Sequence, residues 1–129
     1  MARLIEGKII AEQIETTIKK EIGTLGTVPG LVAVLVGDDP ASHIYVRLKE
    51  AAALRVGVHF ERVHLPADTT QEQLADVIHD LNKRDDIHAI LLQLPLPSHL
   101  NEDEAIACIV PEKDVDGFHP DNSIISPVL

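Results

Sequence analysis

The chain has 129 residues, a formal net charge of −10 at pH 7, 45% hydrophobic residues and 25% charged residues. These values are typical of one globular domain, and the acidic balance excludes an extended phosphate-binding face for nucleic acid. The lone cysteine, Cys108, excludes a disulfide framework and a cysteine-based zinc site and fits a reducing compartment. The sequence has neither a secretion signal nor an apolar run of the ~20 residues that span a membrane. We therefore expect a cytoplasmic protein with no nucleic-acid or membrane partner.

Helix-like and strand-like patterns alternate along the chain. In order they predict a helix at 7–25, a strand at 31–36, a helix at 41–56, a strand at 58–65, a helix opened by residues 66–70, a strand at 87–94 and a helix at 101–110. Apolar residues recur every three or four positions in the helices, whereas the strands at 31–36 and 87–94 are almost continuously apolar. The strand at 58–65 is more polar and is expected nearer a sheet edge. This order predicts an α/β fold, a three-layer domain with a parallel sheet built from right-handed βαβ units.

Polar residues follow the first buried strand. Asp38, Asp39 and Pro40 interrupt it, and either Asp39 or Ser42 is suited to cap the next helix. On that helix Tyr45 and Lys49 are four residues apart and share one face. The carboxyl end of a parallel strand is where open α/β sheets bind ligands, so we consider this pair a candidate site.

Two further features fall beyond the carboxyl end of the third strand. Gln93 lies inside the run Ile-Leu-Leu-Gln-Leu-Pro-Leu-Pro, where an amide is unfavourable to bury without a hydrogen-bonding partner. A lysine amine or a polar ligand would serve as that partner. Asp114 and Asp116 belong to the segment Lys-Asp-Val-Asp-Gly-Phe at 113–118.

Each feature alone has a simpler interpretation. A tyrosine packed along a lysine stem is common on helix surfaces, and two aspartates before a glycine are typical of a solvated turn. The seven histidines show no metal-ligand spacing, so we expect no metal site. A phosphoacceptor receiver domain would need an aspartate where Gln93 stands. A short-chain dehydrogenase would need a glycine-rich first turn, and the sequence contains no Gly-x-Gly-x-x-Gly pattern.

Together these motifs resemble one family closely. The resemblance is to the amino-terminal domain of bifunctional methylenetetrahydrofolate dehydrogenase/methenyltetrahydrofolate cyclohydrolase. Three segments carry it and occur in the same order as in that family: Gly-Asp-Asp-Pro-Ala-Ser-x-x-Tyr-Val-x-x-Lys at 37–49, Leu-Gln-Leu-Pro-Leu-Pro at 92–97 and Pro-x-Lys-Asp-Val-Asp-Gly-Phe at 111–118. The Leu81–Asn82 pair and Asn122 are also similar to that family. The resemblance extends over almost the whole chain.

The resemblance implies a role for each matching position. Lys49 corresponds to the family's catalytic lysine, and Gln93 to the glutamine that hydrogen-bonds and tunes it. Tyr45 is implied to line the folate cleft and to stack near the substrate rings. Asp116 is implied to bind the pterin, and Asp114 is a weaker assignment as a substrate-binding or loop-orienting residue.

The resemblance also implies partners and a domain division. Residues 1–121 are expected to form the folate-binding catalytic domain, and 122–129 to begin the linker to a Rossmann domain that binds NADP in relatives and is not on this chain. Ile124 replaces a glycine of the family, and Leu48 stands where relatives have a small or polar residue. We expect a reduced folate as substrate, a homodimeric parent enzyme, a fragment that can be monomeric, and no NADP-dependent turnover by the fragment. The alternative is a non-catalytic folate-binding or dimer-partner module.

Overall fold

A computed structural model describes the backbone of residues 2–114 and the side chains from residue 9 onward. The elements of this part of the chain are α1 (Ala2–Gly23), β1 (Gly30–Val36), α2 (Pro40–Val56), β2 (His59–Leu65), α3 (Gln71–Asn82), β3 (Ala89–Leu92), α4 (Glu102–Cys108) and a 3₁₀ turn, η1 (Pro111–Lys113). None of its helices combines the length and the apolar character needed to cross a bilayer.

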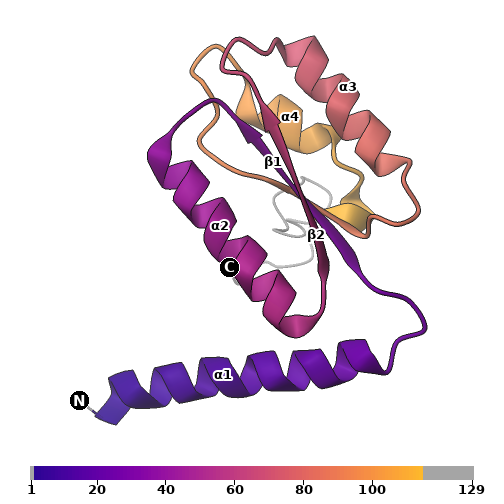
Figure 1. The fold of residues 1–129 in the computed structure, drawn as a ribbon. Coiled ribbons are helices and arrows are strands. Elements are labelled where there is room, and N and C mark those ends of the chain that lie inside the picture. Colours follow the sequence, from indigo (N-terminus) through magenta and orange to yellow (C-terminus); the bar gives the residue numbers. More distant parts are fainter. Residues whose placement is uncertain (1, 115–129) are drawn as a thin grey trace.

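The sheet has the strand order β2-β1-β3, and both pairings are parallel. The predicted α/β fold with a parallel sheet is therefore confirmed. The more polar strand β2 lies at an edge, as expected, and β1 is central and almost completely buried. Parallel strands that follow one another in the chain need a crossover connection, which α2 and α3 provide. The chain crosses from β1 to β2 and then back past β1 to β3, so α2 and α3 lie on opposite faces of the sheet (Figure 1).

Alternation along β1 divides the core into two layers. Val32, Val34 and Val36 pack with the apolar faces of α3 and α4, whereas Ala33 and Leu35 pack with Val46 of α2. Helices therefore cover both faces of the sheet, which confirms the three-layer arrangement (Figure 1). α1 lies outside these layers and contacts α2.

Several element bounds differ from the sequence prediction. α1 begins at Ala2 rather than near residue 7, and its isoleucines at positions 9, 10, 14 and 18 are exposed. α3 begins at Gln71 because Thr70 caps it in a reciprocal capping box with Gln73. β3 ends at Leu92, so Gln93 lies just beyond the strand, and α4 ends at Cys108.

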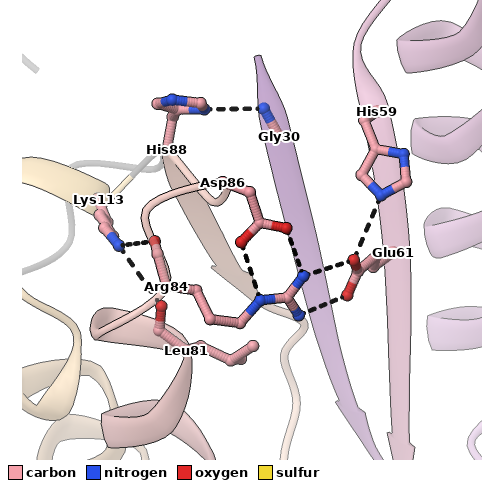
Figure 2. Close-up of polar contacts among 8 residues, drawn as sticks. All are labelled: Gly30, His59, Glu61, Leu81, Arg84, Asp86, His88 and Lys113. Carbon is pink, nitrogen blue, oxygen red and sulfur yellow. Dashed lines mark hydrogen bonds and ion pairs between the residues drawn. The ribbon is translucent and has the colours of Figure 1, made fainter. Parts of the chain in front are cut away.

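Polar contacts tie together the amino ends of the three strands (Figure 2). The Arg84 guanidinium donates to both oxygens of Glu61 at 2.8 Å and also to Asp86. The backbone N–H of Gly30 donates to His88 Nδ1 at 2.9 Å. Gly30 must lack a side chain, because an added Cβ would meet the carbonyl oxygen of Asp86 at 2.1 Å.

The Arg84 contacts predict an acid-sensitive contribution to stability. Hydrogen bonds from Arg84 lower the pKa of Glu61, with a smaller effect of His59, and likewise lower the pKa of Asp86. A depressed carboxyl pKa stabilises the folded state above the ordinary pKa, and this stabilisation is lost as pH falls through the folded-state value. We expect Arg84→Met to lower the urea midpoint near pH 7, and the difference from wild type to shrink toward about pH 3.

The matched control is Arg47→Met, which removes an exposed arginine of α2. Its urea midpoint should follow that of wild type at both pH values. An Arg84→Met deficit that is constant across this pH range would contradict the assignment of the effect to the two carboxylates.

Candidate active site

The turn between β1 and α2 fixes where the candidate helix starts. Gly37 has φ +89°, which a residue with a side chain rarely adopts, and its N–H donates to the carbonyl of Leu65 at 2.9 Å. Asp39 is the N-cap, and its Oδ1 accepts from the Ala41 N–H at 3.1 Å. The choice between Asp39 and Ser42 is thereby resolved, since the Ser42 hydroxyl instead donates to Asp39 Oδ2.

Helical periodicity brings Lys49 toward the sheet. Ser42, Val46 and Ala53 are the buried residues of α2, and they lie on one stripe of the helix. Lys49 falls between Val46 and Ala53 at the same helical spacing. Its stem therefore runs beside the sheet-facing stripe, while the residue as a whole stays exposed.

Lys49 meets Gln93 across the carboxyl ends of the strands. The Lys49 amine donates to Gln93 Oε1 at 2.8 Å, although the two residues are 44 positions apart. Gln93 is 7% exposed, and its backbone N–H donates to the carbonyl of Val34 at 2.9 Å. Its side-chain Nε2 donates to the carbonyl of Leu94 at 3.1 Å. The amide is thus held from both ends, with its oxygen directed at the amine.

Tyr45 lies one turn before Lys49 and is 51% exposed. Its exposed phenol lies on the same helix face as Lys49 and is available for stacking with a planar ring. A groove of about 370 Å³ also borders Lys49, on the side of α1, and it is lined mainly by aliphatic residues such as Leu31, Ala52 and Leu91. Neither Tyr45 nor Gln93 lines this groove, so we place the candidate site on the open Tyr45 side of the amine.

Asp114 lies next to β3, where it forms a parallel bridge with Ile90. The structure therefore brings Asp114 to the strand that ends just before Gln93. Asp116 lies outside the described residues. Its position relative to Lys49 stays a prediction.

Two residues that sequence reasoning did not single out hold this segment in place. The Lys113 amine donates to the carbonyls of Asn82 and Arg84 at 2.8 Å each. A longer contact of 3.4 Å joins it to the carbonyl of Leu81, and Figure 2 draws the contacts to Arg84 and Leu81. The Asn82 side chain donates to the carbonyl of Cys108 and accepts from the N–H of Val110. Both belong to segments that resemble the family, but nothing in the sequence indicates that Lys113 contacts the end of α3 or that Asn82 contacts the segment after α4.

These contacts predict that Lys113 is needed for stability. Replacing Lys113 with Met keeps the aliphatic stem and removes hydrogen bonds from a charged donor, so we expect unfolding to become easier by about 2 kcal/mol in urea titration. The control Lys83→Met, at an exposed lysine that caps α3, should leave the free energy of unfolding within about 0.5 kcal/mol of wild type. Equal losses in the two variants would contradict the role assigned to Lys113.

Comparison with known proteins shows one family. The sequence model of the family described as tetrahydrofolate dehydrogenase/cyclohydrolase, catalytic domain, matches residues 5–116. The bifunctional protein FolD of Methanococcoides burtonii is 55% identical over 124 residues, which cover 93% of this chain and 43% of that protein. FolD of Methanosarcina barkeri is 53% identical and has similar coverage. The chain thus spans less than half the length of these relatives.

Solved structures agree with the sequence comparison. The bifunctional FolD methylenetetrahydrofolate dehydrogenase/cyclohydrolase of Campylobacter jejuni matches with a TM-score of 0.88 at 40% identity, covering 90% of this chain and 42% of that one. The Trypanosoma brucei enzyme, solved with NADP cofactor and inhibitor, matches with a TM-score of 0.90 at 36% identity, covering 95% and 43% of the two chains.

Proposed function

Because this chain belongs to the tetrahydrofolate dehydrogenase/cyclohydrolase catalytic-domain family, we propose that it provides the folate-binding catalytic part of a bifunctional enzyme of one-carbon metabolism. The whole enzyme would oxidise 5,10-methylenetetrahydrofolate with NADP and hydrolyse 5,10-methenyltetrahydrofolate to 10-formyltetrahydrofolate. The observation that carries this proposal is the hydrogen bond from the Lys49 amine to the buried Gln93 amide.

The arrangement suits the hydrolytic step. Water adding to the methenyl carbon must lose a proton, and the adduct must transfer its hydroxyl proton to N5 as the bond from that carbon to N5 breaks; one proton is released overall. Lys49 is the group we assign to accept the proton from water, because general-base catalysis needs a basic group within hydrogen-bond reach of the attacking water. Gln93 acts as a positioning residue, because its oxygen holds the amine toward the sheet edge.

Substrate binding is assigned to the remaining residues. Tyr45 offers an aromatic face for the substrate rings. A carboxylate such as that of Asp116 can accept two N–H groups from a pterin edge, and the resemblance to the family assigns Asp116 to this role. Asp114 is a weaker candidate that orients the segment.

We assign no NADP-binding residue to this chain. Its sequence has no Gly-x-Gly-x-x-Gly pattern, and hydride transfer requires the nicotinamide rather than a side chain. The division at residues 121 and 122, homodimerisation of the whole enzyme and a cytoplasmic location stay predictions from the sequence.

The role of Lys49 predicts the effect of its removal. Lys49→Ala should lower the rate of methenyltetrahydrofolate hydrolysis at least about 100-fold, the ordinary contribution of a general base, as measured by the loss of substrate absorbance. The control Arg47→Ala removes an exposed cation from the same helix and should keep the wild-type rate. Undiminished hydrolysis by Lys49→Ala would remove Lys49 from the mechanism.

Calorimetry with a folate analogue distinguishes the alternative function. A non-catalytic folate-binding or dimer-partner module would bind the analogue without hydrolysing methenyltetrahydrofolate. The catalytic proposal predicts both binding and hydrolysis by the enzyme that contains this domain. Binding alone, with no hydrolysis by that complete enzyme, would favour the module.

A further inference from the structure

Three metal-ligand side chains converge at the carboxyl ends of β1 and β2. Asp38 follows β1, His43 lies in the first turn of α2, and His64 is on β2. One carboxylate oxygen and one nitrogen from each imidazole lie within 4.8 Å of one another. The spacing in the sequence gave no sign of this cluster, which exists because the β1–α2 turn folds back over the end of β2.

The two imidazoles are directed at a single point. Nε2 of His43 lies 3.2 Å and Nε2 of His64 lies 2.8 Å from the carbonyl oxygen of Gly37. Their rings meet edge to face with centroids 4.8 Å apart. The Gly37 carbonyl is itself fixed, because its residue has a left-handed conformation and its N–H is bonded to Leu65.

The Asp38 carboxylate does not cap a helix, and its described contact is with His64. Asp39, not Asp38, caps α2. The Asp38 side chain is 85% exposed, and its Oδ1 lies 3.5 Å from Nε2 of His64. An exposed aspartate can rotate toward a bound ion at little cost.

We propose that Asp38, His43 and His64 form a binding site for a borderline transition-metal ion, with Zn²⁺ as the ion of choice. Ligands about 2.1 Å from zinc in tetrahedral geometry lie roughly 3.4 Å apart, close to the 3.5 Å between His64 Nε2 and Asp38 Oδ1. The three ligand atoms lie within 4.8 Å of one another, so a small closure of these side chains would complete the site. Two imidazoles with one carboxylate favour Zn²⁺, Ni²⁺ or Cu²⁺, whereas Mg²⁺ and Ca²⁺ prefer all-oxygen sites. This proposal replaces the expectation, drawn from sequence spacing, that the chain has no metal site.

The site is separate from the Lys49–Gln93 pair. In the strand order β2-β1-β3, His64 belongs to β2 and Gln93 follows β3, so β1 lies between them. A bound ion would link the end of β2 to the β1–α2 turn. We therefore assign it a structural role, in which zinc holds the start of the helix that carries Lys49.

Zinc titration of the tag-free chain, followed by calorimetry and by thermal unfolding, tests the proposal. We expect one Zn²⁺ per chain and a melting temperature several degrees higher with excess Zn²⁺ than with EDTA, because a ligand that binds only the folded state stabilises it. Co²⁺ should give visible absorption of a tetrahedral site, which Zn²⁺ then removes.

The variants separate ligation from folding. In the metal-free chain, His43→Gln and His64→Gln can still donate an N–H to the Gly37 carbonyl, so the melting temperature in EDTA should be unchanged. With zinc, each variant lacks an imidazole nitrogen that would give up this contact to coordinate the ion, so each should weaken zinc binding at least about 10-fold. Asp38→Asn should weaken binding in the same direction. His79→Gln, at an exposed histidine of α3, is the control and should bind as wild type does.

Cys108 is not part of this cluster, which among the described residues holds only Asp38, His43 and His64. Absence of zinc binding by the wild-type chain would overturn the proposal. So would equal zinc affinity in wild type and the double variant His43→Gln/His64→Gln. Neither result would affect the hydrolytic function proposed for Lys49, which is measured without metal.

Discussion

The hydrogen bond between the Lys49 amine and the Gln93 amide is the interaction on which the candidate site depends. It joins α2 to the end of β3 across the central strand, at 2.8 Å. A buried amide without a partner is costly, and an amine without an anchor would sample many rotamers at the sheet edge. The contact answers both needs at once, because it satisfies Gln93 and restricts Lys49.

The two ends of the sheet have different roles. At the amino ends of the strands, Arg84, Glu61 and Asp86 form an ion-paired network that joins β2 to the loop before β3 (Figure 2). At the carboxyl ends lie the Lys49–Gln93 pair and the cluster of Asp38, His43 and His64. Ligands of open α/β sheets bind at the carboxyl ends, so the division follows from the parallel arrangement of the strands.

Local sequence patterns predicted most of the fold. The apolar run at 31–36 and the glycine at 57 were enough to place β1 and the end of α2, because burial on both faces and a left-handed cap each leave a clear signal. The buried amide of Gln93 indicated that a polar partner was needed. The family resemblance then pointed to Lys49.

What the sequence did not predict depends on contacts between distant segments. The Lys113 amine binds carbonyls at the end of α3, and backbone carbonyls are the same at every position, so no residue pattern marks them. His43 and His64 are 21 positions apart and approach only because β1 and β2 are neighbours. In α1 the spacing of the isoleucines correctly predicted a helix. The same spacing did not predict their burial, because these isoleucines are exposed.

A double-mutant cycle on the free energy of unfolding tests the central contact most directly. Lys49→Met, Gln93→Met and the double variant would be measured by urea titration of the same chain. A hydrogen bond of 2.8 Å to a buried amide predicts that the two single effects are coupled by about 1 kcal/mol. Effects that add to within about 0.3 kcal/mol would show that the amine and the amide do not interact, and would contradict the account of the site.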